Sequence, residues 1–176
     1  MENYFELYEM PVSFQPDAAQ VKQKFYALSK QFHPDRFAQA EEATRAEALR
    51  KAALNNEAYK IFSDADKTMA YILRLNNVLE DEEKYALPPD FLMEMMELNE
   101  AVSDYEDDAE NTLFKNQAEQ ELKQQMDNWN NDVTPLLQSF EQAPEQQELL
   151  IKIKDFYFRK KYLLRISERL TTFASR

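Results

Sequence analysis

Residues 26–37 read Tyr-Ala-Leu-Ser-Lys-Gln-Phe-His-Pro-Asp-Arg-Phe, and this stretch indicates how the front of the chain folds. It ends a helix that opens at Asp17, where Gln20 follows at the spacing of a capping box. The helix must stop before Pro34, because a proline ring disfavours helical geometry in the preceding residue. A loop is therefore expected over residues 33–42. The predicted buried stripe of the helix consists of Val21, Phe25, Leu28 and Phe32.

Helical periodicity extends outward from this stretch over nearly the whole chain. A second helix is expected over residues 43–62 and a shorter one after Asp64, which together close a first domain at residues 1–76. Residues 77–89 contain an acidic run and then two prolines, a composition typical of a linker. Residues 90–176 are expected to form a second domain. The predicted fold is all-α, and the second domain is a three-helix bundle with helices at about 90–106, 110–142 and 145–173.

The middle helix of the predicted bundle shows its buried seam most clearly. Apolar residues step by four and three along it, as in a helix packed against helices. Pro135 interrupts the pattern and is expected to kink or split the helix. The seam consists of Leu122, Met126, Trp129, Val133, Leu136 and Phe140.

The composition excludes several classes of function. The chain has no glycine, so it lacks the loops that bring backbone close to phosphate, which argues against a nucleotide-binding enzyme. It has no cysteine and one histidine, so disulfides and most zinc sites are excluded, and no metal or cofactor is expected. The net charge of −12 disfavours nucleic acid and anionic membranes. No apolar run reaches membrane length and no signal or transit peptide is recognisable, so a cytosolic protein partner is expected.

One segment of this negatively charged chain is positively charged. Residues 22–36 carry a local surplus of three positive charges. Lys22, Tyr26 and Lys30 are spaced by four, so they share a solvent-facing side of the helix that leads to His33. From charge alone, an ordinary solvated helix face is favoured over a binding surface as the explanation of this pattern.

Two stretches of sequence together resemble a known family. Residues 26–37, followed by Asn-Glu-Ala-Tyr-Lys-Ile-Phe-Ser-Asp at residues 56–64, are similar to helix II, the His-Pro-Asp loop and helix III of J-domains. The resemblance covers residues 1–75 and implies an antiparallel helical hairpin with two short helices. The combination of tripeptide, basic helix and following helix is specific, whereas His-Pro-Asp alone would mean little.

The next stretches resemble one subfamily. Residues 68–75 run on as an apolar helix, where J-domains in general place arginine and aspartate around a tyrosine. This version resembles the HscB subfamily, and residues 90–98 are similar to the start of that subfamily's C-terminal domain. The resemblance fades through residues 110–176. The cysteine pairs of some animal members are absent, which implies no bound metal and a bacterial cytoplasm.

The resemblance implies a function. HscB proteins bring an iron-sulfur scaffold protein of the IscU type to a seventy-kilodalton heat-shock chaperone of the HscA type, and stimulate its ATPase without being enzymes. The implied role is therefore that of a co-chaperone in iron-sulfur cluster assembly, and a general J-protein with another client is the alternative. A hydrolase using His33 and Asp35 is disfavoured, because no third group or enclosed pocket is evident. The residues expected to bind the chaperone are Lys22, Tyr26, Lys30, His33, Pro34, Asp35 and Arg36.

The helix at 90–106 predicts a second surface. At 100° per residue, its seam is Phe91, Met95, Leu98, Val102 and Tyr105, which leaves other apolar residues on the far side among acids. Packing against the first domain, or simple solubilisation, is the alternative explanation of that side. The resemblance implies that it binds the scaffold, with an aromatic on the last helix completing the contact. The matching residues are Leu92, Met93, Met96, Glu97, Glu100 and Asp104, with Phe156 chosen from three adjacent aromatics and equally explained as core.

Overall fold

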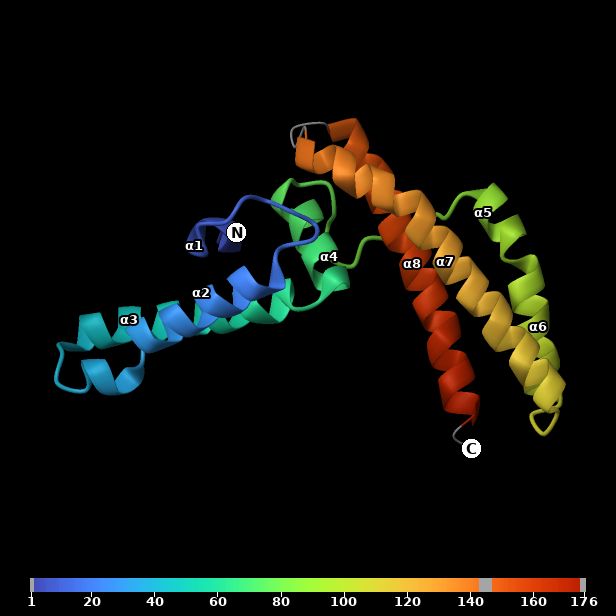
Figure 1. Ribbon diagram of the computed structural model, residues 1–176, viewed down its shortest axis with the longest axis horizontal. Helices are drawn as coiled ribbons and strands as arrows, with labels where there is room; N and C mark the ends of the chain where they lie inside the picture. The colour runs from blue at the N-terminus through green and yellow to red at the C-terminus, as the bar shows by residue number, and fades with distance from the viewer. Residues whose placement is uncertain (1, 143–146, 175–176) are drawn as a thin grey trace. The chain divides into compact units, whose positions relative to one another are not determined.

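The computed structural model describes residues 2–142 and 147–174, and within these ranges the chain is built of helices without strands (Figure 1). The expected all-α class is confirmed. The chain divides into two compact units, Met1–Leu79 and Glu80–Arg176. Within the described ranges, no helix is both long and apolar enough to span a membrane.

The first unit is a helical hairpin flanked by short helices. Helix α2, Ala18–Gln31, lies antiparallel to α3, Glu42–Phe62, while α1, Tyr4–Leu7, and α4, Ala65–Leu75, pack against α3 (Figure 1). The Asp17 carboxylate caps α2 by accepting a hydrogen bond from the Gln20 N–H at 2.7 Å, as the sequence predicts. The expected loop at 33–42 is partly wrong, because residues 34–37 form a 3-10 helix, η1.

A buried polar network holds α2 against α3. Asn55 is 1% exposed, and its amide Nδ2 donates to the Phe25 carbonyl and to Ser29 Oγ on α2, both at 3.0 Å. The Tyr8 hydroxyl in turn donates to Asn55 Oδ1 at 2.9 Å, and burial raises the pKa of that phenol. Because buried polar groups are costly when unpaired, these bonds fix the register of the hairpin.

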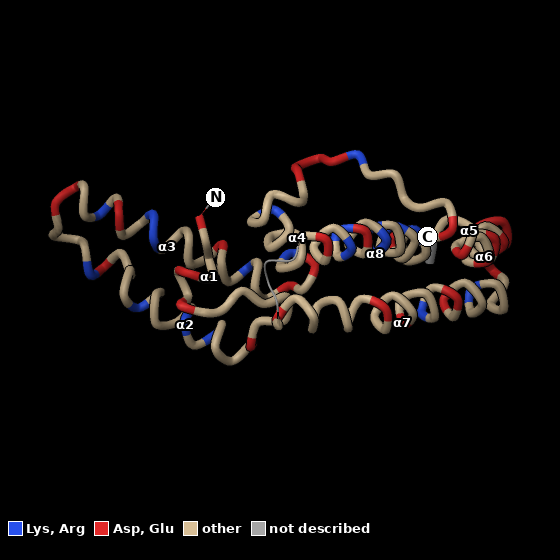
Figure 2. Tube along the Cα trace, turned by 90° about the horizontal axis from the view of Figure 1, so that it is seen from above, with Lys and Arg blue, Asp and Glu red and all other residues tan. Residues whose placement is uncertain are grey.

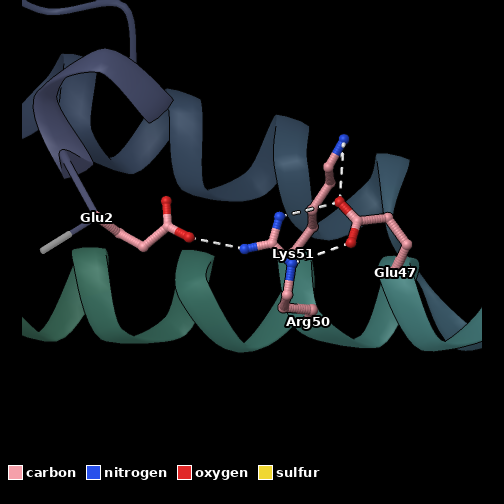
Figure 3. A network of polar contacts seen from close by, with 4 residues as sticks. All are labelled: Glu2, Glu47, Arg50 and Lys51. Atoms are coloured by element: carbon pink, nitrogen blue, oxygen red, sulfur yellow. Dashed lines mark hydrogen bonds and ion pairs between the residues drawn. The ribbon is translucent and has the colours of Figure 1, made fainter.

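A second, exposed network ties the start of the chain to α3. Arg50 lies between two carboxylates, donating to Glu2 Oε1 at 2.7 Å and to Glu47 Oε2 at 2.9 Å (Figure 3). Hydrogen bonding to Arg50 lowers the pKa of Glu47. Exposed ion pairs of this kind contribute little to stability, so the main anchor of the start of the chain is the apolar packing of Phe5 against Phe62.

The second unit is the predicted three-helix bundle. Helix α7, Thr112–Gln142, packs against both α6, Met96–Asp107, and α8, Gln147–Ala174 (Figure 1). The prediction of one helix over 90–106 is wrong, because a turn at Met95, with ψ near 0°, separates α6 from a short α5, Pro89–Glu94. The expected start of the last helix, residue 145, lies outside the described residues.

The seam of α7 is largely as predicted. Trp129, Val133 and Phe140 are buried, and Leu122 and Met126 are half-buried. Leu137 is buried in place of the half-buried Leu136. Pro135 does not split the helix, because α7 continues through it, and the alternative of a kink stays a prediction. Packing on two neighbouring helices compensates for the one backbone hydrogen bond that proline removes.

Because the chain has no glycine, other residues must occupy left-handed backbone conformations. Glu82 has a φ of 55° and an exposed side chain. Glu82→Gly is expected to stabilise the second unit by about 0.5–1 kcal/mol, since glycine has no Cβ to strain there. Urea unfolding followed by the fluorescence of Trp129 measures this, with Asp81→Gly as the control at a residue without positive φ. Equal destabilisation by the two changes would contradict the argument.

Candidate chaperone-binding and client-binding surfaces

The His33-Pro34-Asp35 turn is built by the end of α2 and the start of η1. The Phe32 N–H completes α2 by donating to the Leu28 carbonyl at 2.9 Å. His33 then caps η1, and its carbonyl accepts from the Arg36 N–H at 3.0 Å. The Arg36 guanidinium donates back to the Lys30 carbonyl at 3.3 Å. These bonds fix the turn against the end of the basic helix.

Two aromatic side chains hold the turn against α3. Phe32 and Phe37 are half-buried and line one hollow with Ala48 and Lys51 of α3. The Lys51 ammonium lies 5.2 Å from the centre of the Phe32 ring, a distance at which cations attract aromatic rings. The turn is therefore held on the α2–α3 hairpin while its own polar side chains remain in solvent.

The predicted chaperone-binding residues are exposed on the first unit. Tyr26, Lys30, His33 and Arg36 line a common open hollow of about 660 Å³. Ser29 also lines it and is not among the predicted residues, although it lies four positions before His33. The remaining members of the predicted set, also exposed, are Lys22, Pro34 and Asp35.

The geometry of the turn suits recognition better than catalysis. His33 Nδ1 lies 3.6 Å from Asp35 Oδ2, and the two side chains are 58% and 90% exposed. That nitrogen also faces the Asp35 N–H at 3.4 Å. Many active sites exclude water from around the reacting groups, and this open turn does not. Within the described ranges, no three His, Cys, Asp or Glu side chains converge on a possible metal position.

In the second unit, α5 and α6 present apolar side chains to solvent. Leu92, Met93 and Met96 are 42%, 70% and 64% exposed. The same two helices also bury an apolar seam. That seam is confirmed as predicted, although the turn at Met95 interrupts the helix. The seam residues are all 4% exposed or less: Phe91, Met95, Leu98, Val102 and Tyr105.

Acidic side chains surround these apolar residues. Residues 90–110 contain nine acids and no base, and red segments mark them along α6 in Figure 2. Glu106 is neutralised by Arg169 of α8 at 2.7 Å. In the part of the chain that the structure describes, the carboxylates of Glu97, Glu100 and Asp104 form no ion pair, and all three residues are exposed. We call Leu92, Met93, Met96 and these three acids the acidic methionine face.

Phe156 of α8 is half-buried. Its ring packs edge-on against Trp129, with ring centres 6.5 Å apart, and its carbonyl accepts from the Trp129 indole at 2.8 Å. The Arg159 guanidinium lies 5.2 Å from the Phe156 ring and 5.0 Å from Phe91 at the start of α5. Phe156 therefore contributes to the core of the bundle, and its predicted contact with a client remains a prediction.

Comparisons with known proteins match this architecture. The family described as the HSCB C-terminal oligomerisation domain matches residues 87–171. The co-chaperone protein HscB homolog of Vibrio campbellii is 41% identical over 115 residues, which are 64% of this chain and 67% of that relative. The homolog of Vibrio cholerae strain M66-2 is 41% identical over 99 residues, and this chain spans 58% of its length.

Solved structures extend the likeness to both units. The chaperone HscB from Vibrio cholerae has a TM-score of 0.62 and 28% identity, and the match covers 96% of this chain and 99% of that one. The human co-chaperone protein HscB has a TM-score of 0.74 over 98% of this chain and 82% of its own, and at 23% identity it supports the fold alone. The predicted J-domain with a helical C-terminal domain is thus confirmed, and the chain belongs to the HscB family of co-chaperones.

Proposed function

We propose that this protein stimulates the ATPase of a heat-shock chaperone of the HscA type and delivers to it an iron-sulfur scaffold protein of the IscU type. One observation carries the proposal: two exposed surfaces of opposite charge lie on separate compact units. The basic surface ends in the His33 turn, and the other is the acidic methionine face. The protein acts as an adaptor and not as an enzyme, in a bacterial cytoplasm.

The basic surface acts first through its charge. Lys22 and Lys30 attract an acidic patch on the chaperone, which accelerates encounter more than it strengthens the complex. Once docked, His33 and Asp35 contact groups that differ between the two states of the chaperone. A co-chaperone that binds the hydrolysis-competent state more tightly shifts the chaperone toward that state by this difference in affinity.

The acidic methionine face holds the client by a different balance of forces. Methionine side chains are flexible and polarizable, so Met93 and Met96 adapt to an apolar patch on the scaffold. Burying them supplies affinity, whereas the surrounding carboxylates select a scaffold surface with positive charge. The two steps are chemically independent because they use different residues on different units.

Purified components test the proposal. The full-length protein is expected to accelerate ATP hydrolysis by the HscA-type chaperone and to bind an IscU-type scaffold in a titration. A general J-protein with another client would instead bind ordinary unfolded proteins and leave the scaffold unbound. ATP turnover or ester hydrolysis by the isolated protein, lost in His33→Gln, would revive the hydrolase alternative.

Charge reversal on the client face has a specific expected result. Replacing Glu97, Glu100 and Asp104 with lysine is expected to slow association with the scaffold about tenfold at low salt, because rim charges act chiefly on the association rate. ATPase stimulation without scaffold is expected to stay unchanged. The control reverses three exposed acids of α7: Glu119, Asp127 and Asp132. Stopped-flow association rates that are equal in the two variants would dismiss the face.

A further inference from the structure

Residues 83–87, which precede α5, fold onto α8 and form a cleft with it inside the second unit. The Tyr85 ring stacks on Phe158 with centres 4.4 Å apart and planes within 4° of parallel. The Tyr85 hydroxyl donates to Asp155 Oδ1 at 2.7 Å, and Lys154 forms an ion pair with Glu83. The cleft that results has a volume of about 490 Å³ and is lined by Tyr85, Leu87, Phe158, Lys161 and Arg165, among others.

The charge of this cleft is opposite to that of the protein as a whole. Helix α8 carries seven cations and three acids, in a chain whose net charge is −12. Away from the cleft wall, Arg159 is paired with Asp155 at 2.5 Å. Over the described ranges, Lys161 and Arg165 meet no carboxylate within ion-pair distance. They are exposed and four residues apart, so they project from the same side of the helix.

Exposed Lys84 adds a third cation to the cleft wall, whereas Glu83 and Tyr85 are already engaged. Lys154 and the Glu80 N–H both hydrogen-bond Glu83, and the bond from Lys154 lowers the pKa of that carboxyl. Burial and the bond to Asp155 raise the pKa of Tyr85 to about 12, so its hydroxyl stays a donor committed to that carboxylate. The cationic side chains therefore dominate the polar character that remains, and a ligand must bring hydrogen-bond acceptors with negative charge.

The walls decide what kind of anion fits. An apolar surface lies beside Lys161 and Arg165, made by the stacked rings of Tyr85 and Phe158 and by the side chain of Leu87. A lysine and an arginine one helical turn apart match two carboxylates with an apolar side chain between them. Nucleic acid fits poorly, because a phosphate chain carries a charge at every nucleotide and is bound through a long basic surface, whereas this chain has a net charge of −12. A nucleotide base would also find few hydrogen-bond partners, since Tyr85 and Glu83 are already hydrogen-bonded within the protein.

We propose that this cleft binds an acidic peptide segment of a partner protein, with Lys161 and Arg165 holding its carboxylates and the Tyr85–Phe158 stack holding an apolar side chain. Such a segment is unlike the partner of the acidic methionine face, which must be basic or apolar. The cleft therefore provides a third contact, distinct from the His33 turn and from that face. It uses no residue assigned to either of them.

Fluorescence anisotropy of the full-length protein with short labelled peptides tests the proposal directly. The probe is a peptide of alternating glutamate and leucine, and its matched control carries glutamine in place of glutamate. Saturable binding of the acidic probe alone is expected. Its carboxylates pair with the cations of the cleft, and burial of its leucine side chains adds to the binding free energy. Absence of saturable binding, or equal binding of the glutamine peptide, would overturn the proposal.

Variants locate the binding. Lys161→Gln with Arg165→Gln is expected to weaken the acidic peptide about tenfold, the effect of losing two ion pairs. Lys60→Gln with Lys152→Gln removes the same charge at exposed positions outside the cleft and is expected to change little. An equal loss of peptide affinity in both double variants would mean that only net charge matters and would overturn the proposal. Tighter binding of labelled ATP than of the peptide would also overturn it, because the cleft would then be a phosphate site. Neither chaperone nor scaffold enters this experiment, so it is independent of the function proposed above.

Discussion

His33→Gln is expected to reduce ATPase stimulation of the partner chaperone to the unstimulated rate while leaving affinity for the scaffold within about twofold. The imidazole is exposed at the end of the basic helix, so its loss removes a recognition group and little packing. Exposed substitutions change stability by about 0.5 kcal/mol or less. The fold, and with it the second unit, should therefore be intact.

Steady-state ATPase assays over a range of co-chaperone concentrations check this result. Gln39→Ala is the matched control, because Gln39 is an exposed residue of the same loop outside the predicted surface. Circular dichroism verifies that both variants are folded. Stimulation by His33→Gln within twofold of the wild type would refute the assignment of the turn.

Met93→Ala with Met96→Ala is expected to weaken scaffold binding about 30-fold. Each methionine is more than half exposed in the free protein and loses about 1 kcal/mol of apolar burial in the complex when truncated. The seam beneath, including Met95 and Leu98, is untouched, so the bundle should keep its stability.

Isothermal titration with the scaffold measures the effect. Leu113→Ala is the matched control, because Leu113 is 75% exposed on α7 of the same unit and lies outside the face. The methionine variant should still stimulate the chaperone's ATPase in the absence of scaffold. An affinity equal to that of Leu113→Ala would rule out the acidic methionine face as the client contact.

Periodic patterns predicted the fold well where one helix packs on its neighbours. The seam from Phe91 to Tyr105 is buried as its spacing indicates, and Asp17 caps α2 as its sequence context indicates. Local backbone detail was harder to predict. The 3-10 helix after His33 and the turn at Met95 each change only a few hydrogen bonds, which apolar spacing does not report.

Contacts between residues distant in sequence could not be predicted in the same way. Asn55 carries no pattern that marks it as the buried partner of Tyr8, 47 positions away. Tyr85 lies in a stretch that reads as a linker, and its contact with Asp155 spans 70 positions. Both interactions depend on how elements dock, and single-sequence periodicity describes each element alone.

The division of labour between two units is tested most directly by co-purification from the native cell. Tagged wild-type protein, His33→Gln and the Met93→Ala, Met96→Ala variant are each recovered, and their partners are identified by mass spectrometry. The wild type is predicted to retain an HscA-type chaperone and an IscU-type scaffold, His33→Gln only the scaffold, and the methionine variant only the chaperone. Loss of both partners together in either folded variant, or absence of both from the wild-type sample, would contradict this division of labour.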